Sequence, residues 1–122
     1  MVKLYSFDLD AEKGTFFVKV GGIFKEEDAK IYLSEFQTLV NSINPSRYTL
    51  IIDGQGQEEF SSYLEEDLEF ALKLYWRANF KKIIIIQPAF PDARMQVENC
   101  VKKINFPGIF VDSLEEAFNL SG

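Results

Sequence analysis

The sequence predicts an α/β fold in which a β-hairpin is followed by strands that alternate with helices, in the order β-β-α-β-α-β-α-β-α. The chain has 122 residues, of which 47% are hydrophobic and 15% aromatic, enough apolar surface for one domain spanning residues 1–122. An alternation of apolar and polar residues at its start indicates two short antiparallel strands. Beyond them, short apolar runs alternate with helical segments of crossover length, so right-handed connections are expected to align the later strands in parallel.

The hairpin is predicted from strands at residues 2–9 and 15–20, joined by a tight turn over residues 10–14. Gly21 and Gly22 are expected to end the second strand, because paired glycines are typical of turns.

Residues 25–43 carry apolar side chains at steps of three and four residues, which predicts an amphipathic helix. Asn44 and Pro45 are expected to end it. Its predicted inward face holds Ala29, Tyr32, Leu33, Phe36, Leu39, Val40 and Ile43.

The next strand is predicted over residues 48–52, and residues 54–57 are predicted to form a turn. A second helix is expected to begin at Ser61 or Ser62 and to run to about Asn79. Its predicted inward face holds Leu64, Leu68, Ala71, Leu72, Tyr75 and Ala78.

Residues 83–86 are four consecutive isoleucines, and a strand that is apolar on both faces belongs in the middle of a covered parallel sheet. A third helix is predicted over residues 92–104 and a last strand over residues 109–111. The closing helix is expected to begin at Ser113, whose spacing to Glu116 matches a capping box. The side chains expected to dock it are Leu114, Ala117, Phe118 and Leu120.

The charge balance and the absence of histidine exclude several classes of function. Thirteen basic against nineteen acidic residues give a net charge of −6, so neither nucleic acid nor an anionic membrane is an expected partner. Without histidine there is no Ser-His-Asp or Cys-His nucleophile and no His-based zinc site. The acidic run at residues 58–69 lacks the spacing of a calcium loop, and Phe60 stands where a dinucleotide-binding loop needs its third glycine. The sequence predicts a non-enzymatic protein with no metal and no cofactor.

Cys100 is the only cysteine, and its neighbours Val97 and Val101 place it on a buried helix face as a small hydrophobic residue. This use of cysteine favours a reducing cytoplasm. No segment has the pattern of a signal peptide or a membrane span, so we expect the protein to stay in the cytoplasm.

Three segments point to a known family. Val-Gly-Gly-Ile-Phe at residues 20–24 leads into the first helix, Leu-Ile-Ile-Asp at residues 50–53 forms the next strand, and Val-Asp-Ser-Leu-Glu-Glu-Ala-Phe at residues 111–118 closes the chain. Together with the opening hairpin, this pattern resembles, over essentially the whole chain, the STAS domains of the bacterial anti-sigma-factor antagonists. The resemblance implies a SpoIIAA-like fold and a regulatory role through protein contact, with a regulatory kinase among the partners.

In that family an Asp-Ser-Ser-Gly motif opens the second long helix, and a partner kinase phosphorylates one of its serines to switch binding off. The corresponding residues here are Phe60, Ser61, Ser62 and Tyr63, so the serine pair is retained while the aspartate and the glycine are replaced. The resemblance therefore implies Ser62 or Ser61 as the phosphoacceptor. Ser62 also has capping-box spacing to Glu65, so a helix cap is the alternative role for the same serine.

Acidic and aromatic residues gather where the second helix is expected to begin. Aromatic side chains would supply desolvated contact area, and the acids would set partner choice and the rate of approach. The predicted partner-binding residues are Gly56, Glu58, Glu59, Phe60, Tyr63 and Glu66. Basic residues come later in the chain, and this division of charge would also allow self-association.

The aromatic content allows a second interpretation. The chain has 12 Phe, 5 Tyr and 1 Trp, more than one inward stripe of the second helix can hold. The alternative function is therefore a small-ligand-binding domain with an apolar pocket between the second helix and the sheet.

Overall fold

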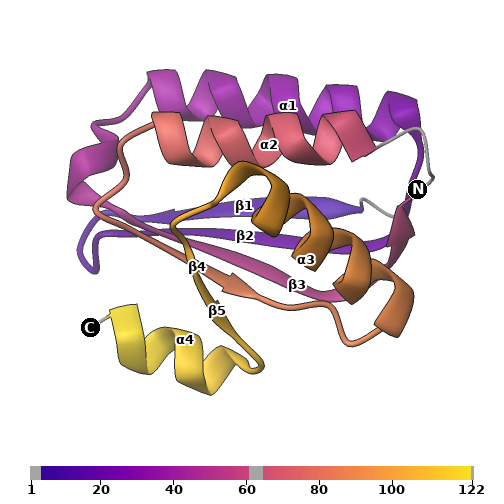
Figure 1. The fold of residues 1–122 in the computed structure, drawn as a ribbon. Helices are drawn as coiled ribbons and strands as arrows, with labels where there is room; N and C mark the ends of the chain where they lie inside the picture. Colours follow the sequence, from indigo (N-terminus) through magenta and orange to yellow (C-terminus); the bar gives the residue numbers. More distant parts are fainter. Residues whose placement is uncertain (1–3, 61–64, 122) are drawn as a thin grey trace.

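The computed structural model describes residues 4–60 and 65–121, and within them a five-stranded sheet carries helices on both faces (Figure 1). The strands lie in the order β1-β2-β3-β4-β5, so each strand neighbours the next one in the sequence. The predicted α/β fold class is confirmed, including the opening hairpin and the alternation that follows it.

The element bounds agree with the predicted order. The strands are β1 (Tyr5–Asp10), β2 (Thr15–Phe24), β3 (Thr49–Phe60), β4 (Lys82–Ile86) and β5 (Ile109–Val111). The helices are α1 (Glu26–Asn41), α2 (Glu65–Arg77), α3 (Pro91–Ile104) and α4 (Leu114–Ser121), with a 3-10 turn at Pro45–Arg47. None of the helices in residues 4–60 and 65–121 combines the length and the apolar character needed to cross a bilayer.

The hairpin turn is held by its own residues and then joins the next strand. The Asp10 carboxylate accepts a hydrogen bond of 3.1 Å from the backbone N–H of Lys13. Gly14 takes a positive φ of 64°, a conformation that glycine adopts at little cost. Its carbonyl oxygen accepts a hydrogen bond of 2.8 Å from the N–H of Thr49, so the turn also fixes the start of β3.

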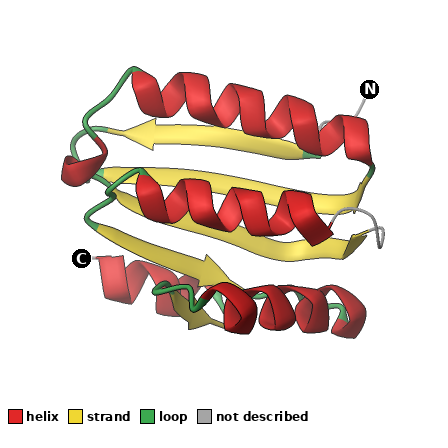
Figure 2. Ribbon diagram, turned by 45° about the horizontal axis from the view of Figure 1, so that its top comes forward, coloured by secondary structure: helices red, strands yellow, loops and turns green. Residues whose placement is uncertain are grey.

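The connections decide which face each helix covers. Strand β1 is antiparallel to β2, whereas β2, β3, β4 and β5 run parallel. Each crossover connects a strand to its immediate neighbour, and all of the crossovers progress across the sheet in the same direction. Right-handed crossovers that progress in one direction place their helices on one face of the sheet. Figure 2 shows α1, α2 and α3 in front of the sheet and α4 behind it.

The sheet separates two apolar cores. The larger core lies beneath α1, α2 and α3, where Phe16, Phe36 and Leu72 are almost fully buried, and it includes Cys100, as the sequence predicts. The smaller core lies beneath α4. It is built from Ile51, Ile84, Ile86, Val111 and Ala117, with Phe17 packed against it.

Strand β4 has the position predicted for residues 83–86, between β3 and β5. Ile85 belongs to the larger core and Ile83 packs against it, whereas Ile84 and Ile86 belong to the smaller core. The strand is apolar throughout because both of its faces are covered.

The structure corrects two expected chain breaks, at residues 21–22 and at residues 54–57. Both segments are extended, because β2 and β3 continue through them as a parallel pair. Gly21 and Gly56 are paired in this ladder, and a Cβ atom on Gly21 would lie 3.5 Å from the carbonyl oxygen of Gly56, an ordinary van der Waals contact.

The same strand pair contains two irregularities. The register shifts between Lys19 and Gly21 and again between Gly22 and Ile23, and at each shift β3 contains one residue more than β2. Extra residues of this kind bend a strand and redirect the side chains beyond them.

The structure also corrects the packing predicted for the closing helix. Ala117 is fully buried, but Leu114, Phe118 and Leu120 remain 37%, 51% and 41% exposed. The Phe118 ring stacks on Phe17 with the ring centroids 6.0 Å apart. The predicted cap of α4 is confirmed, because Ser113 Oγ accepts a hydrogen bond of 3.2 Å from the N–H of Glu116.

Candidate functional site

An apolar cavity of about 90 Å³ lies between the sheet and the layer of α1, α2 and α3. It is placed at the carboxyl ends of β2, β3 and β4, the edge of an α/β sheet at which ligands usually bind. The lining residues are Val20, Ala29, Tyr32, Leu33, Ile52, Gly54, Gln57, Leu68, Ala71, Leu72, Tyr75, Ile85, Ile86, Pro88 and Val97.

Small residues at inward positions leave room for this cavity. Ala29 on α1 and Ala71 on α2 face the sheet where larger apolar side chains would fill the space. Gly54 on β3 also lines it, and a Cβ atom there would lie 3.0 Å from the carbonyl oxygen of Ile86. The close approach of the last residue of β4 therefore favours glycine at position 54.

Two tyrosines from neighbouring helices meet at the cavity wall. The hydroxyl groups of Tyr32 on α1 and Tyr75 on α2 are hydrogen-bonded to each other, and both side chains are buried. Burial raises the pKa of Tyr32 well above its ordinary value of 10.0, and the neighbouring Tyr75 raises it further. Burial likewise raises the pKa of Tyr75. Both phenols are therefore neutral at physiological pH.

The amide of Gln57 is a further polar group of the lining. Its side chain is 1% exposed and donates a hydrogen bond of 3.0 Å from Nε2 to the carbonyl oxygen of Gly22. The contact links β3 to β2 where the register shifts. The sequence predicts Gln57 as part of a turn, and only the pairing of the two strands reveals its buried position.

Acidic side chains lie along the edge of the sheet at which the cavity is found. Glu27 and Asp28 stand in the first turn of α1, Glu66 stands in the first turn of α2, and Glu58 stands near the end of β3, so all four belong to the end of the sheet at which the cavity is found. The acids are exposed except for the half-buried Asp28. We call these residues the acidic rim: Glu27, Asp28, Glu58 and Glu66.

The predicted partner-binding residues within the described part of the chain belong to β3 and α2 rather than to a turn. Gly56 and Glu58 are exposed residues of β3, and Glu66 is exposed in the first turn of α2. The backbone of Glu59 and Phe60 belongs to the end of β3, while their side chains lie outside the part of the chain that the structure describes.

Three predicted site residues fall in the segment between β3 and α2. Ser61, Ser62 and Tyr63 lie outside the described residues, and so does the expected start of the second helix. Their assignment as phosphoacceptors and partner contact stays a prediction.

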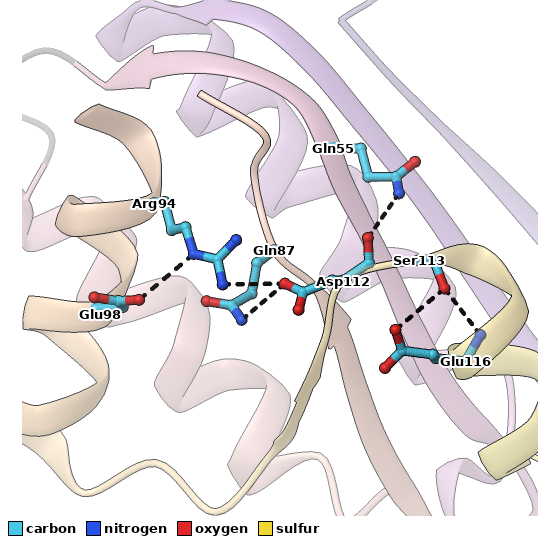
Figure 3. A network of polar contacts seen from close by, with 7 residues as sticks. All are labelled: Gln55, Gln87, Arg94, Glu98, Asp112, Ser113 and Glu116. Atoms are coloured by element: carbon cyan, nitrogen blue, oxygen red, sulfur yellow. Dashed lines mark hydrogen bonds and ion pairs between the residues drawn. The ribbon is translucent and has the colours of Figure 1, made fainter. Parts of the chain in front are cut away.

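A separate polar network joins Gln55 of β3 to α3 and to the residues that directly follow β4 and β5 (Figure 3). Arg94 Nη2 lies 3.0 Å from Asp112 Oδ1, and Arg94 Nε lies 3.6 Å from the Glu98 carboxylate. Gln55 Nε2 donates a hydrogen bond of 3.2 Å to the backbone carbonyl of Asp112, and Gln87 Nε2 lies 3.5 Å from Oδ1 of the same residue. The network fixes the junction of β5 and α4 against the rest of the sheet.

Among the side chains described in residues 4–60 and 65–121, no group of three or more Asp, Glu, Cys or His residues is placed to hold a metal ion. The buried carboxylate of Asp53 accepts a hydrogen bond of 3.1 Å from the N–H of Gln55, within its own strand.

Solved structures share this fold at low sequence identity. An anti-sigma factor antagonist from Mycobacterium paratuberculosis superposes with a TM-score of 0.67 and 16% identity, over 96% of this chain and 93% of that one. An uncharacterised protein from Shewanella loihica with a SpoIIAA-like fold superposes with a TM-score of 0.66 and 17% identity, over 97% and 92% of the two chains. No protein-family model and no curated protein matches the sequence. The comparisons therefore show a SpoIIAA-like fold.

Proposed function

We propose that the protein is a non-enzymatic regulatory module of the bacterial cytoplasm that binds another protein at the sheet edge between β3 and α2. The observation that carries this proposal is the acidic rim next to an apolar cavity, because apolar contact area framed by charge is typical of protein-binding surfaces. The fold shared with an anti-sigma factor antagonist supports a regulatory role.

Charge reversal at this edge tests the proposal. The variant Glu58→Lys/Glu66→Lys changes the net charge from −6 to −2 and reverses two exposed acids, without disturbing a core side chain. We expect it to lose partners that the wild-type protein captures from an extract of its native cells, because the rim would then repel a basic surface.

A matched control carries the same change of net charge elsewhere. The variant Glu12→Lys/Glu115→Lys reverses exposed acids in the hairpin turn and on α4, far from the cavity in the sequence and on other elements. It should keep every specific partner. Equal capture by both variants and the wild-type protein would remove this edge from consideration as a binding surface.

Phosphorylation would act on the same edge. A phosphate on Ser61 or Ser62 would add about two negative charges beside carboxylates and so weaken binding of a basic partner. The test is incubation with ATP and an extract of the native cells, followed by intact-mass measurement of the wild type and of Ser61→Ala/Ser62→Ala. A mass unchanged in the wild type would end this part of the proposal. If Ser62 is instead a helix cap, Ser62→Ala should lower the free energy of unfolding by about 1 kcal/mol.

The cavity favours a second candidate function, the binding of a small apolar molecule between α2 and the sheet. Native mass spectrometry of freshly purified protein separates the two candidates. A retained small molecule favours ligand binding, whereas a retained polypeptide favours the interaction module.

A further inference from the structure

The cavity offers a partner apolar contact, because its polar groups are already engaged. Tyr32 and Tyr75 are hydrogen-bonded to each other, and the Gln57 amide donates to the Gly22 carbonyl. The remaining lining residues are aliphatic, glycine or proline. A group that enters the cavity therefore gains by leaving water, with no hydrogen bond to satisfy.

The volume limits what can enter. The cavity measures about 90 Å³, whereas an apolar cavity of roughly 150 Å³ is known to hold a benzene ring. A branched aliphatic group, such as the side chain of leucine or isoleucine, fits this space better than an aromatic ring. Single apolar side chains that fill a preformed pocket are typical anchors of protein interfaces.

The charges of the acidic rim indicate which residues of a partner would stand on either side of such an anchor. The acidic rim contributes Glu27, Asp28, Glu58 and Glu66, whereas the neighbouring Glu26 is paired with Lys30 at 3.4 Å. Glu69 is paired with Lys103 at 3.1 Å, and the nearby Arg94 is paired with Asp112 at 3.0 Å. The acidic rim thus keeps an excess of negative charge, which complements lysine or arginine on a partner.

We propose that the cavity is the anchor pocket for one aliphatic side chain of a partner polypeptide, in a segment that carries lysine or arginine on either side of the anchor. This inference rests on the proposed function, because it specifies what the protein-binding edge recognises. A neutral apolar metabolite would make no use of the acidic rim, and an anionic membrane surface would be repelled by it.

The experiment begins with a displayed library of random-sequence peptides selected on the immobilised full-length protein. The expected enriched peptides share one aliphatic residue flanked by basic residues. A synthetic peptide with the enriched sequence is then measured by fluorescence polarisation. Replacing its aliphatic residue with serine should weaken binding by about tenfold or more, and raising the salt concentration should weaken it further.

Protein variants locate the binding. Ala71→Leu fills the cavity from α2, and Leu33→Phe fills it from a half-buried position on α1. If one of the two variants does not fold, the other still tests the cavity. Each should weaken the peptide by about tenfold or more. The control Ala78→Leu adds the same volume on the C-terminal side of α2, outside the cavity lining, and should change the affinity by no more than about twofold.

Several outcomes would overturn the inference. They are no enrichment, enrichment of acidic or aromatic peptides without an aliphatic anchor, and an affinity that neither Ala71→Leu nor Leu33→Phe changes. Partner capture distinguishes this failure from failure of the proposed function. If Glu58→Lys/Glu66→Lys loses partners that Ala71→Leu retains, the edge binds protein without using the cavity. If neither variant loses them, both proposals fail.

Discussion

The hydroxyl groups of Tyr32 and Tyr75, 43 residues apart in the sequence, form a buried hydrogen bond that joins α1 to α2 across the cavity wall. The two rings also pack against Phe36, with centroid distances of 6.2 Å and 5.0 Å. This pair joins two of the helices that, with α3 and the sheet, enclose the cavity.

A double-mutant cycle should detect this bond. Tyr32→Phe and Tyr75→Phe each remove one partner and are expected to lower the free energy of unfolding by about 1–3 kcal/mol, because a buried hydroxyl loses its neighbour. The double variant should cost less than the sum of the two, since it leaves neither hydroxyl behind. Urea unfolding of the four proteins measures the coupling, and strictly additive losses would contradict it.

The tyrosines also make stability depend on pH in the alkaline range. Burial raises the pKa of Tyr32 and Tyr75, and it raises the pKa of Tyr5 to about 12, with Glu35 contributing. In the unfolded chain these phenols lose their protons near pH 10, so the folded state binds more protons above that pH. The contribution of these tyrosines to the free energy of unfolding is therefore complete below about pH 10 and is lost as the pH rises further.

Denaturant unfolding at a series of alkaline pH values checks this dependence. The free energy of unfolding should fall with rising pH in the wild type and should fall less steeply in Tyr32→Phe/Tyr75→Phe. Equal slopes in the two proteins would show that the buried pair does not cause the loss.

Gly14 in the hairpin turn should not tolerate a side chain. Its φ is +64°, and a Cβ atom would lie 3.0 Å from the carbonyl oxygen of Arg47. We expect Gly14→Ala to lower the free energy of unfolding by about 1–2 kcal/mol. Gly21→Ala is the matched control, because its φ is not positive and its nearest contact would be 3.5 Å. Thermal unfolding of both variants measures the difference, and an equal melting temperature would refute the conformational argument.

The cap of α4 should contribute about 1 kcal/mol to the free energy of unfolding. Ser113→Ala removes the oxygen that accepts the Glu116 N–H, and α4 covers the smaller core through Ala117. Ser34→Ala, at an exposed position inside α1, should change stability by less than about 0.5 kcal/mol. Equal effects of the two substitutions in urea unfolding would contradict a capping role.

The sequence predicted the elements whose local pattern and tertiary surroundings agree. The isoleucines of residues 83–86 are apolar on both faces, and both faces are covered. Ser113 and Glu116 show cap spacing and form the cap. In such segments burial, propensity and capping favour the same structure.

The errors occur where a residue serves a contact between distant segments. Gly21 and Gly56 have the sequence signature of turns, yet they lie opposite each other within paired strands. Leu114 and Phe118 have the spacing of a docked helix face, but α4 buries chiefly Ala117. The spacing of apolar residues along a helix does not show how much of its apolar face the neighbouring elements cover.

The cavity could be predicted only in outline. The sequence predicts a pocket lined by the aromatic excess between the second helix and the sheet. A cavity lies there, but its lining is chiefly aliphatic, with Tyr32 and Tyr75 as its aromatic residues. Its size depends on Ala29, Gly54 and Ala71 together, which three separate elements bring to one place. The spacing of residues within any one element carries no information about that convergence.

The division of the molecule into two cores lets the protein change one side independently of the other. Ile51, Ile84, Val111 and Ala117 beneath α4 do not line the cavity, and effects on stability at well-separated sites are expected to add. The α4 side can therefore diverge, or be redesigned to carry a label or a fused partner, while the cavity on the opposite face of the sheet is preserved.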